Sequence, residues 1–211
     1  MGSKLFINAS NFTRYKFKKK SILDLCAAPG GKAFQVLAED NNIILNDVSK
    51  KRIKILKENL LRLNYNTKIN NFNALVFPEK KKYDVVLLDA PCSATGTIRG
   101  NPEIFFKKKP PNLISLFELQ KNLLEKAANL LNPNGIIVYM VCSFLYSETT
   151  GQINNFLKNN KNFSILKYDK QKNNDILESF LSKDGYFLTT PNTYKNYNID
   201  GFFSIQLIKN D

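Results

Sequence analysis

The stretch that decides the fold of this chain is SILDLCAAPGGK, residues 21–32. Its first part, Ser21–Cys26, is a short, mostly apolar run that is typical of a buried strand. Pro29-Gly30-Gly31 then predicts a tight turn, and a helical pattern follows over Lys32–Glu39. A strand, a glycine turn and a helix in that order predict the first unit of an α/β fold.

The same alternation continues along the rest of the chain. Strands are predicted at Ser21–Cys26, Ile43–Val48, Thr67–Phe72, Tyr83–Leu88, Gly135–Cys142, Phe163–Tyr168 and Phe202–Lys209. Further helices are predicted at Ser49–Leu63 with Ser49 as N-cap, at Leu113–Leu131 ending before the Asn132–Gly135 turn, and near Ser147–Lys158. The polar stretch Lys170–Asn198 is expected to be an irregular surface excursion. We therefore predict a mainly parallel, seven-stranded sheet with helices on both faces.

Length and composition favour one globular domain. The chain has 211 residues and a hydrophobic fraction of 43%, enough for one large core. We expect residues 1–20 to be a basic tail and residues 21–211 to be the catalytic domain. No apolar stretch reaches the roughly 18–20 residues of a membrane-spanning helix, so no membrane association is expected. The three cysteines lie in or beside apolar runs, which favours reduced thiols and a cytoplasmic protein.

The formal net charge of +13 favours a polyanionic partner such as nucleic acid. The excess is mainly lysine, because the only arginines are Arg14, Arg52, Arg62 and Arg99. An AT-rich genome also produces this bias, so the charge alone does not decide the partner.

Two cysteines follow two separate apolar runs. Cys92 comes after Val85–Leu88, and Cys142 comes after Ile136–Val141. If those runs are neighbouring strands, both sulfur atoms lie at the same edge of the sheet. Such a pair suits attack on a ring carbon followed by elimination, as methylation of cytosine requires. Simple burial is the alternative for each thiol, and for Cys26 it is the preferred interpretation.

The glycine turn is a candidate cofactor loop, because ligands of doubly wound sheets bind beyond the carboxyl ends of the strands. Asp47 ends the second strand, where an acid accepts hydrogen bonds from ribose hydroxyls. Capping of the next helix is the alternative role for this residue. Together with Asp24 and Asp89, it makes an acidic edge that disfavours a phosphate-rich dinucleotide. A cationic, phosphate-free nucleoside such as S-adenosylmethionine fits this edge better.

These motifs resemble those of one family. Ile22–Lys32 resembles the cofactor motif of RNA cytosine-5 methyltransferases of the RsmB/Sun (Fmu) type. Asp89–Gly96 with Arg99, and Gly135–Tyr139 leading to Cys142-Ser143, resemble the two cysteine motifs of that family. Asp200–Phe203 also has a counterpart, and the similarity covers about residues 21–209.

The resemblance implies a Rossmann-like S-adenosylmethionine-dependent methyltransferase fold and a cytosine in small-subunit (16S) ribosomal RNA as the target. It implies that Cys142 attacks carbon 6 of the base and that Cys92 assists product release. Asp89 is our candidate for the contact with ring nitrogen 3, and Arg99 and Lys32 are candidates for RNA contacts. The implied cofactor-binding residues are Cys26, Ala27, Ala28, Pro29, Gly30, Gly31, Lys32, Asp47, Asn73 and Asp89. A transfer RNA substrate, or a non-catalytic relative that binds cofactor or RNA, are the alternatives.

Several positions depart from the family pattern. Val141 replaces the usual Thr before the nucleophile, and Asn73 stands where an acid usually follows the third strand. Ser147 replaces one of the acidic residues after the second cysteine motif and leaves Glu148. Because the chain has no histidine, thiol activation is left to Lys32 or to backbone N–H groups. The absence of histidine and the spacing of the cysteines also disfavour a zinc site, so no metal is expected.

Overall fold

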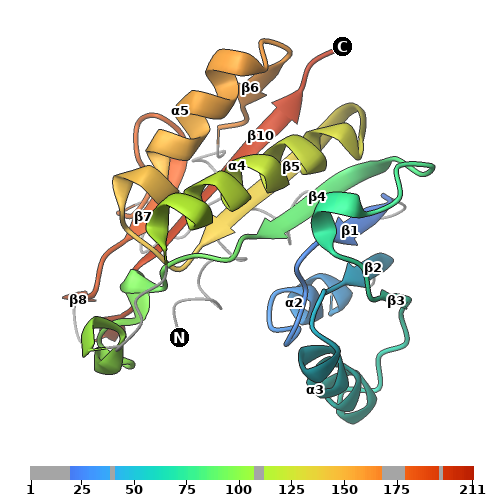
Figure 1. Cartoon of the computed structure of the whole chain (residues 1–211), viewed down its shortest axis with the longest axis horizontal. Coiled ribbons are helices and arrows are strands. Elements are labelled where there is room, and N and C mark those ends of the chain that lie inside the picture. The colour runs from blue at the N-terminus through green and yellow to red at the C-terminus, as the bar shows by residue number, and fades with distance from the viewer. Residues whose placement is uncertain (1–19, 39–40, 107–111, 168–178, 195–196) are drawn as a thin grey trace.

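A central sheet with helices on both faces forms the body of the molecule (Figure 1). The computed structural model describes residues 20–38, 41–106, 112–167, 179–194 and 197–211. The expected basic tail, residues 1–20, lies outside the described residues except for Lys20.

The main sheet follows the strand order β3-β2-β1-β4-β5-β10-β6. The bounds of these strands are β1 Ile22–Asp24, β2 Ile43–Asn46, β3 Ile69–Asn70, β4 Tyr83–Asp89, β5 Leu131–Val141, β6 Phe163–Ile165 and β10 Phe202–Lys209. The first five strands of that order are parallel, and β10 runs antiparallel to β5. This arrangement confirms the predicted, mainly parallel α/β sheet. An eighth strand, β7 (Tyr186–Thr189), also pairs with β10.

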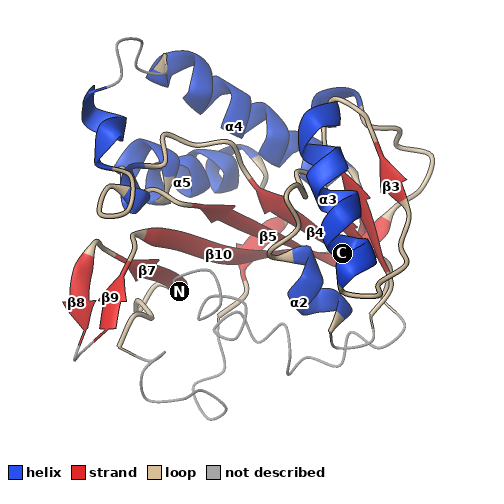
Figure 2. Ribbon diagram, turned by 90° about the horizontal axis from the view of Figure 1, so that it is seen from below, coloured by secondary structure: helices blue, strands red, loops and turns tan. Residues whose placement is uncertain are grey.

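Helices cover both faces of the sheet (Figure 2). Their bounds are α2 Ala33–Leu37, α3 Lys50–Arg62, α4 Leu113–Asn129 and α5 Thr150–Asn159, and the short 3₁₀ helices are η1 Ala74–Val76, η2 Thr95–Thr97, η3 Pro102–Phe106 and η4 Tyr146–Glu148. Alternate residues of β4 belong to different cores: Val86 packs in the core with α4 and α5, and Val85 in the core with α2 and α3. No helix in the described ranges is long and apolar enough to cross a membrane.

The predicted N-cap of α3 is present. The Ser49 hydroxyl accepts a hydrogen bond from the Arg52 N–H at 3.3 Å, and its backbone is extended. The side chains of Ile53, Leu56 and Leu60, one turn apart on this helix, are buried. Helical periodicity in the sequence therefore located this element to within one residue at each end.

The described part of the Lys170–Asn198 region contains more regular structure than we predicted. The part of it that the structure describes contains β7 and a small hairpin of β8 (Asn192–Tyr194) and β9 (Tyr197–Ile199). The Phe187 side chain in β7 is 1% exposed and packs in the core on the α2 and α3 side. The prediction of an irregular excursion was therefore wrong for 186–189, because a four-residue strand is too short to show a period within a polar stretch.

The turn at Asn132–Gly135 lies within β5. The strand begins at Leu131, which pairs with Tyr83, and the next pair joins Ile136 to Val85. The intervening residues form a bulge in which Asn134 has a φ of 56°. The Asn132 side-chain amide donates to Asp84 Oδ1 at 3.0 Å and holds this bulge against β4. The strand predicted from Gly135 thus corresponds to the regular part of β5.

Candidate active site

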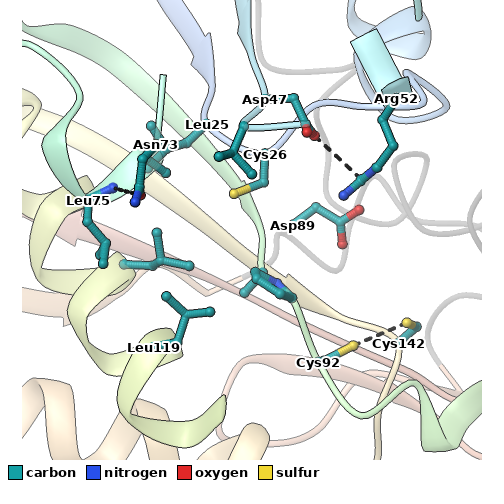
Figure 3. A pocket seen from close by; sticks show the side chains of 15 residues that line it. Leu25, Cys26, Asp47, Arg52, Asn73, Leu75, Asp89, Cys92, Leu119 and Cys142 are labelled. Atoms are coloured by element: carbon teal, nitrogen blue, oxygen red, sulfur yellow. Dashed lines mark hydrogen bonds and ion pairs between the residues drawn. The ribbon is translucent and has the colours of Figure 1, made fainter. Parts of the chain in front are cut away.

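A cavity of about 420 Å³ lies where the strand order reverses, at the carboxyl ends of β1 and β4 (Figure 3). This is the position at which open α/β sheets bind ligands. Its polar lining includes Asp47, Asn73 and Asp89, and Cys92 and Cys142 lie at one side. Leu75, Leu119 and Leu123 supply apolar walls. An acidic, partly apolar cavity fits the adenosine and the positive charge of S-adenosylmethionine.

Most of the glycine turn does not line the cavity, but the turn contacts Asp47 and Arg52, which do. Of the predicted cofactor loop, residues 26–32, only Cys26 lines the cavity. The Ala28 N–H donates to Asp47 Oδ2 at 3.1 Å, and an Arg52 Nη donates to the Ala28 carbonyl. Gly30 has a φ of 110°, and a Cβ there would clash with the Phe34 ring. Glycine is therefore required at that position for both its dihedral angle and its packing. Ala27, Pro29, Gly31 and Lys32 do not line the cavity either.

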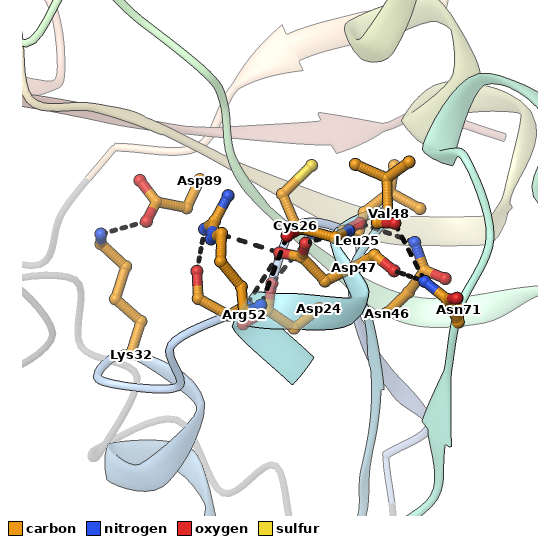
Figure 4. Close-up of polar contacts among 12 residues, drawn as sticks. Asp24, Leu25, Cys26, Lys32, Asn46, Asp47, Val48, Arg52, Asn71 and Asp89 are labelled. Atoms are coloured by element: carbon orange, nitrogen blue, oxygen red, sulfur yellow. Dashed lines mark hydrogen bonds and ion pairs between the residues drawn. The ribbon is translucent and has the colours of Figure 1, made fainter. Parts of the chain in front are cut away.

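Asp47 lies both beside the cavity and at the start of α3. Its side chain is 2% exposed, yet it borders the cavity. Its carboxylate accepts the Ser49 N–H at 2.9 Å, at the start of α3, and forms an ion pair with Arg52 at 3.5 Å (Figure 4). A carboxylate offers about four acceptor positions, so these contacts still leave one for a ligand hydroxyl.

Three acidic side chains lie close together at this edge. Asp89 forms an ion pair with Lys32, whose ammonium also lies 5.3 Å from the centre of the Phe202 ring (Figure 4). Asp24 is 1% exposed and accepts the Cys26 N–H at 3.3 Å. Burial, together with the negative charge of Asp89, raises the pKa of Asp24 to about 7. A cation bound in the cavity would favour the ionised form of this carboxyl group.

The structure brings the two cysteines of the sequence motifs together. Cys92 Sγ and Cys142 Sγ are 3.2 Å apart (Figure 3). Parallel pairing places Asp89 beside Met140, and the Gly96 N–H donates to the Cys142 carbonyl at 3.0 Å. Both thiols therefore emerge from the ends of neighbouring strands β4 and β5.

The contact between the two sulfur atoms makes the thiols unequal. The hydrogen bond with Cys92 lowers the pKa of Cys142; burial and the negative charge of Asp89 oppose this effect, and Lys32 supports it. The same hydrogen bond and burial raise the pKa of Cys92 well above the usual range. The pKa directions favour a hydrogen bond that the Cys92 thiol donates and Cys142 Sγ accepts. Among the effects that lower the pKa of Cys142, the hydrogen bond with Cys92 is larger than the effect of Lys32.

Cys26 differs from the other two thiols. Burial, followed by the charges of Asp24 and Asp47, raises its pKa well above the usual range. It packs against the core on the α4 side of the sheet. These properties fit the packing role that we preferred for Cys26, with one side bordering the cavity.

The remaining predicted residues have identifiable contacts. Asn73 Oδ1 accepts the Leu75 N–H at 3.0 Å and caps η1, and the residue lines the cavity. Arg99 is exposed and forms an ion pair with Asp200 at 3.8 Å. Val141, which departs from the family pattern, is fully buried in the core with α4 and α5. In the described ranges, no group of three or more His, Cys, Asp or Glu side chains is arranged to hold a metal ion.

A buried polar network beside Cys92 was missed by sequence reasoning. Glu148 and Gln120 are both 0% exposed, and both contact the segment around Cys92. Gln120 lies on the apolar face of α4, three and four residues before the buried Leu123 and Leu124. The sequence signal for this network was a glutamine on the predicted buried face of a helix, because a buried amide requires polar partners.

Comparison with known proteins places the chain in a family. The family described as 16S rRNA methyltransferase RsmB/F matches residues 16–208. Ribosomal RNA small subunit methyltransferase B of Photorhabdus laumondii is 36% identical over 178 residues, which are 80% of this chain and 41% of that protein. Ribosomal RNA small subunit methyltransferase F of Vibrio vulnificus is 32% identical over 98% of this chain and 43% of its own length. The chain thus spans about two fifths of these curated relatives.

Solved structures agree with this assignment. NSun6 from Pyrococcus horikoshii, solved with the S-adenosylmethionine analogue SFG, has a TM-score of 0.79 and 25% identity. The match covers 100% of this chain and 52% of that protein. The predictions of a Rossmann-like methyltransferase fold and of S-adenosylmethionine as cofactor are confirmed. The chain belongs to the 16S rRNA methyltransferase RsmB/F family.

Proposed function

We propose that this chain transfers a methyl group from S-adenosylmethionine to carbon 5 of a cytosine in small-subunit ribosomal RNA. The observation that carries the proposal is the 3.2 Å separation of Cys92 Sγ and Cys142 Sγ beside the cavity. Two thiols at that distance have access to one pyrimidine ring, one as nucleophile and the other as base. The base must leave its helix or lie in a single-stranded loop to reach them.

The cavity residues hold the cofactor in this proposal. Asp47 accepts hydrogen bonds from the ribose, and Asn73, with the apolar side chains near it, contacts the adenine. The acidic edge formed by Asp24 and Asp89 stabilises the positive charge. When bound, S-adenosylmethionine supplies an electrophilic methyl group on its sulfonium.

Cys142 acts first. Its thiolate adds to carbon 6 of the cytosine, and the electrons of the carbon 5–carbon 6 double bond make carbon 5 nucleophilic. The hydrogen bond from Cys92 maintains the thiolate before attack. Asp89, held by Lys32, shares a proton with ring nitrogen 3 and offsets the negative charge that addition places on the ring.

Cys92 acts after methyl transfer. Its thiolate removes the proton from carbon 5, those electrons restore the double bond, and the carbon 6–sulfur bond breaks to return the Cys142 thiolate. While Cys142 is bonded to the base, it carries no negative charge and accepts a hydrogen bond only weakly. The two effects of Cys142 that raise the pKa of Cys92 are therefore weakened in the adduct, so Cys92 releases its proton to solvent more readily at that stage.

The test is to map 5-methylcytosine in defined RNAs. The chain is incubated with S-adenosylmethionine and either an unmodified small-subunit ribosomal RNA transcript or unmodified transfer RNA transcripts, and the products are sequenced after bisulfite treatment. We expect a protected cytosine in the ribosomal RNA and none with Cys142→Ala. Protection in transfer RNA alone would mean that the substrate is wrong. Protection in neither RNA would contradict catalysis by this chain.

A further inference from the structure

Glu148 is a buried carboxylate to which the proposed reaction gives no task. Its side chain is 0% exposed. Among the described residues, no lysine or arginine forms an ion pair with it. Burial of a carboxyl group without a counter-charge is costly unless hydrogen bonds replace water. The partners that replace water therefore indicate what the fold uses this residue for.

Within the described ranges, the hydrogen bonds to the Glu148 carboxylate come from Ser93, which follows Cys92, and from Gln120. Oε1 accepts the Ser93 backbone N–H at 2.8 Å, and Oε2 accepts the Ser93 hydroxyl at 2.5 Å. Gln120 Nε2 donates to Oε1 at 3.0 Å. The same nitrogen lies 2.9 Å from the Pro91 carbonyl oxygen, to which it also donates. The residues immediately before and after Cys92 are thus both held by this pair of buried side chains.

The pair is itself fixed on the helical layer and on β5. Gln152 Nε2 donates to the Phe117 carbonyl at 2.7 Å and lies 3.5 Å from Gln120 Oε1. The Tyr139 hydroxyl donates to the backbone carbonyl of Glu148 at 2.8 Å. Neither Glu148 nor Gln120 therefore has to be ordered when RNA arrives.

We propose that Glu148, with Gln120, is a positioning residue that holds Cys92 in place for the release step. This inference deepens the proposed function and rests on it. Cys142 is held differently, since its backbone follows the β5–β10 pairing and its carbonyl accepts the Gly96 N–H. Loss of Glu148 should therefore disturb the release thiol more than the nucleophile.

The negative charge of Glu148 supports the same division of roles. It contributes to the raised pKa of Cys92, after the larger effects of the Cys142 hydrogen bond and burial. The charged or titratable groups that act on Cys92 are Glu148 and Cys142. Those that act on Cys142 are Asp89, Lys32 and Cys92. The buried Tyr139 also lies within electrostatic reach of Cys92. The carboxylate thus favours the protonated form of Cys92, which donates the hydrogen bond to Cys142.

The first experiment separates adduct formation from adduct release. Glu148→Ala, Glu148→Gln and the exposed control Glu118→Gln are mixed with S-adenosylmethionine and an unmodified small-subunit ribosomal RNA transcript in single-turnover reactions. For Glu148→Ala we expect release to slow by about 10-fold or more, with formation within about 3-fold of the unmodified chain. Glu148→Gln keeps an acceptor for the Ser93 N–H and should be intermediate. Equal slowing of both steps, or no slowing, would overturn the proposal.

The second experiment needs no RNA, so it stands even if the proposed reaction is wrong. Alkylation of each cysteine by iodoacetamide is followed by mass spectrometry in the full chain. Because Glu148→Ala releases the segment around Cys92, we expect the Cys92 rate to rise several-fold while Cys26 stays slow. An unchanged Cys92 rate, or a parallel rise at Cys26 from general loosening, would contradict a positioning role. Absence of any RNA adduct together with the expected alkylation would reject the cytosine chemistry alone.

Discussion

Asp24 shows how one residue at the end of a strand links stability to ligand binding. It ends β1 beneath the cavity, where burial and Asp89 raise its pKa to about 7 from the usual value near 3.8. The folded state therefore binds this proton more tightly than the unfolded state does. Its stabilising contribution is complete below about pH 4 and is lost as the pH rises through about 7. At pH 8 the ionised group is a cost that a cationic ligand offsets.

Replacement of Asp24 by Asn should therefore stabilise the ligand-free chain at pH 8. The amide keeps an acceptor for the Cys26 N–H but carries no charge. We expect the Tm to rise by several degrees at pH 8 and the gain to shrink at pH 5, as measured by circular dichroism. The affinity for S-adenosylmethionine should fall.

Asp84→Asn is the matched control for this measurement. Although burial opposes it, hydrogen bonds from Ser21 and Asn132 lower the pKa of Asp84. This carboxylate is thus ionised at both pH values, and its replacement should destabilise the chain about equally at each. If Asp24→Asn instead lowered the Tm at pH 8, the ionised Asp24 carboxylate would not destabilise the folded chain, and the prediction would be wrong.

At the scale of elements, two glycines join the turn before β10 to the segment that carries Cys92. The Gly201 N–H donates to the Gly96 carbonyl at 2.7 Å, while the Gly96 N–H donates to the Cys142 carbonyl. A Cβ on Gly201 would lie 2.7 Å from the Gly96 Cα, which is backbone and cannot move aside easily. This close approach connects β10 to the ends of β4 and β5, where the two thiols lie.

We expect Gly201→Ala to lower methyl transfer by about 10-fold or more, because the methyl group forces the segments apart. Gly100→Ala is the control, since the nearest atom to a Cβ there is the Thr97 carbonyl oxygen at 3.8 Å. Initial rates with the ribosomal RNA transcript measure both variants. Equal rates for the two would mean that the glycine contact does not set the position of the thiols.

The elements differ in how well the sequence revealed them. The pattern of α3, with Ser49 before Ile53, Leu56 and Leu60, gave clear periodicity and a clear start. β7 gave neither, because it has only four residues, it lies in a polar region, and its place in the sheet depends on pairing with β10. Asn132–Gly135 was predicted to be a turn because the sequence does not show that pairing with β4 continues on both sides of it. Strand pairing, which decides both cases, is a long-range property that local pattern does not contain.

For the whole molecule, the alternation of strands and helices was sufficient to predict that the side chains at the strand ends lie close together. Parallel strands place their carboxyl ends together, so Asp24, Asp47, Asp89, Cys92 and Cys142 converge although they are far apart in sequence. The sequence could not show that Asp89 pairs with Lys32, or that Glu148 contacts Ser93. Those contacts depend on side-chain directions that only the packed structure fixes.

The central claim is that Cys142 attacks the base and Cys92 releases it. Cys92→Ala, Cys142→Ala and the control Cys26→Ala are each incubated with S-adenosylmethionine and labelled small-subunit ribosomal RNA transcript, and covalent complexes are separated on a denaturing gel. Our account predicts that Cys92→Ala accumulates a protein–RNA adduct, that Cys142→Ala forms none, and that Cys26→Ala behaves as the unmodified chain. An adduct that accumulates with Cys142→Ala, or with neither of the two site variants, would contradict it.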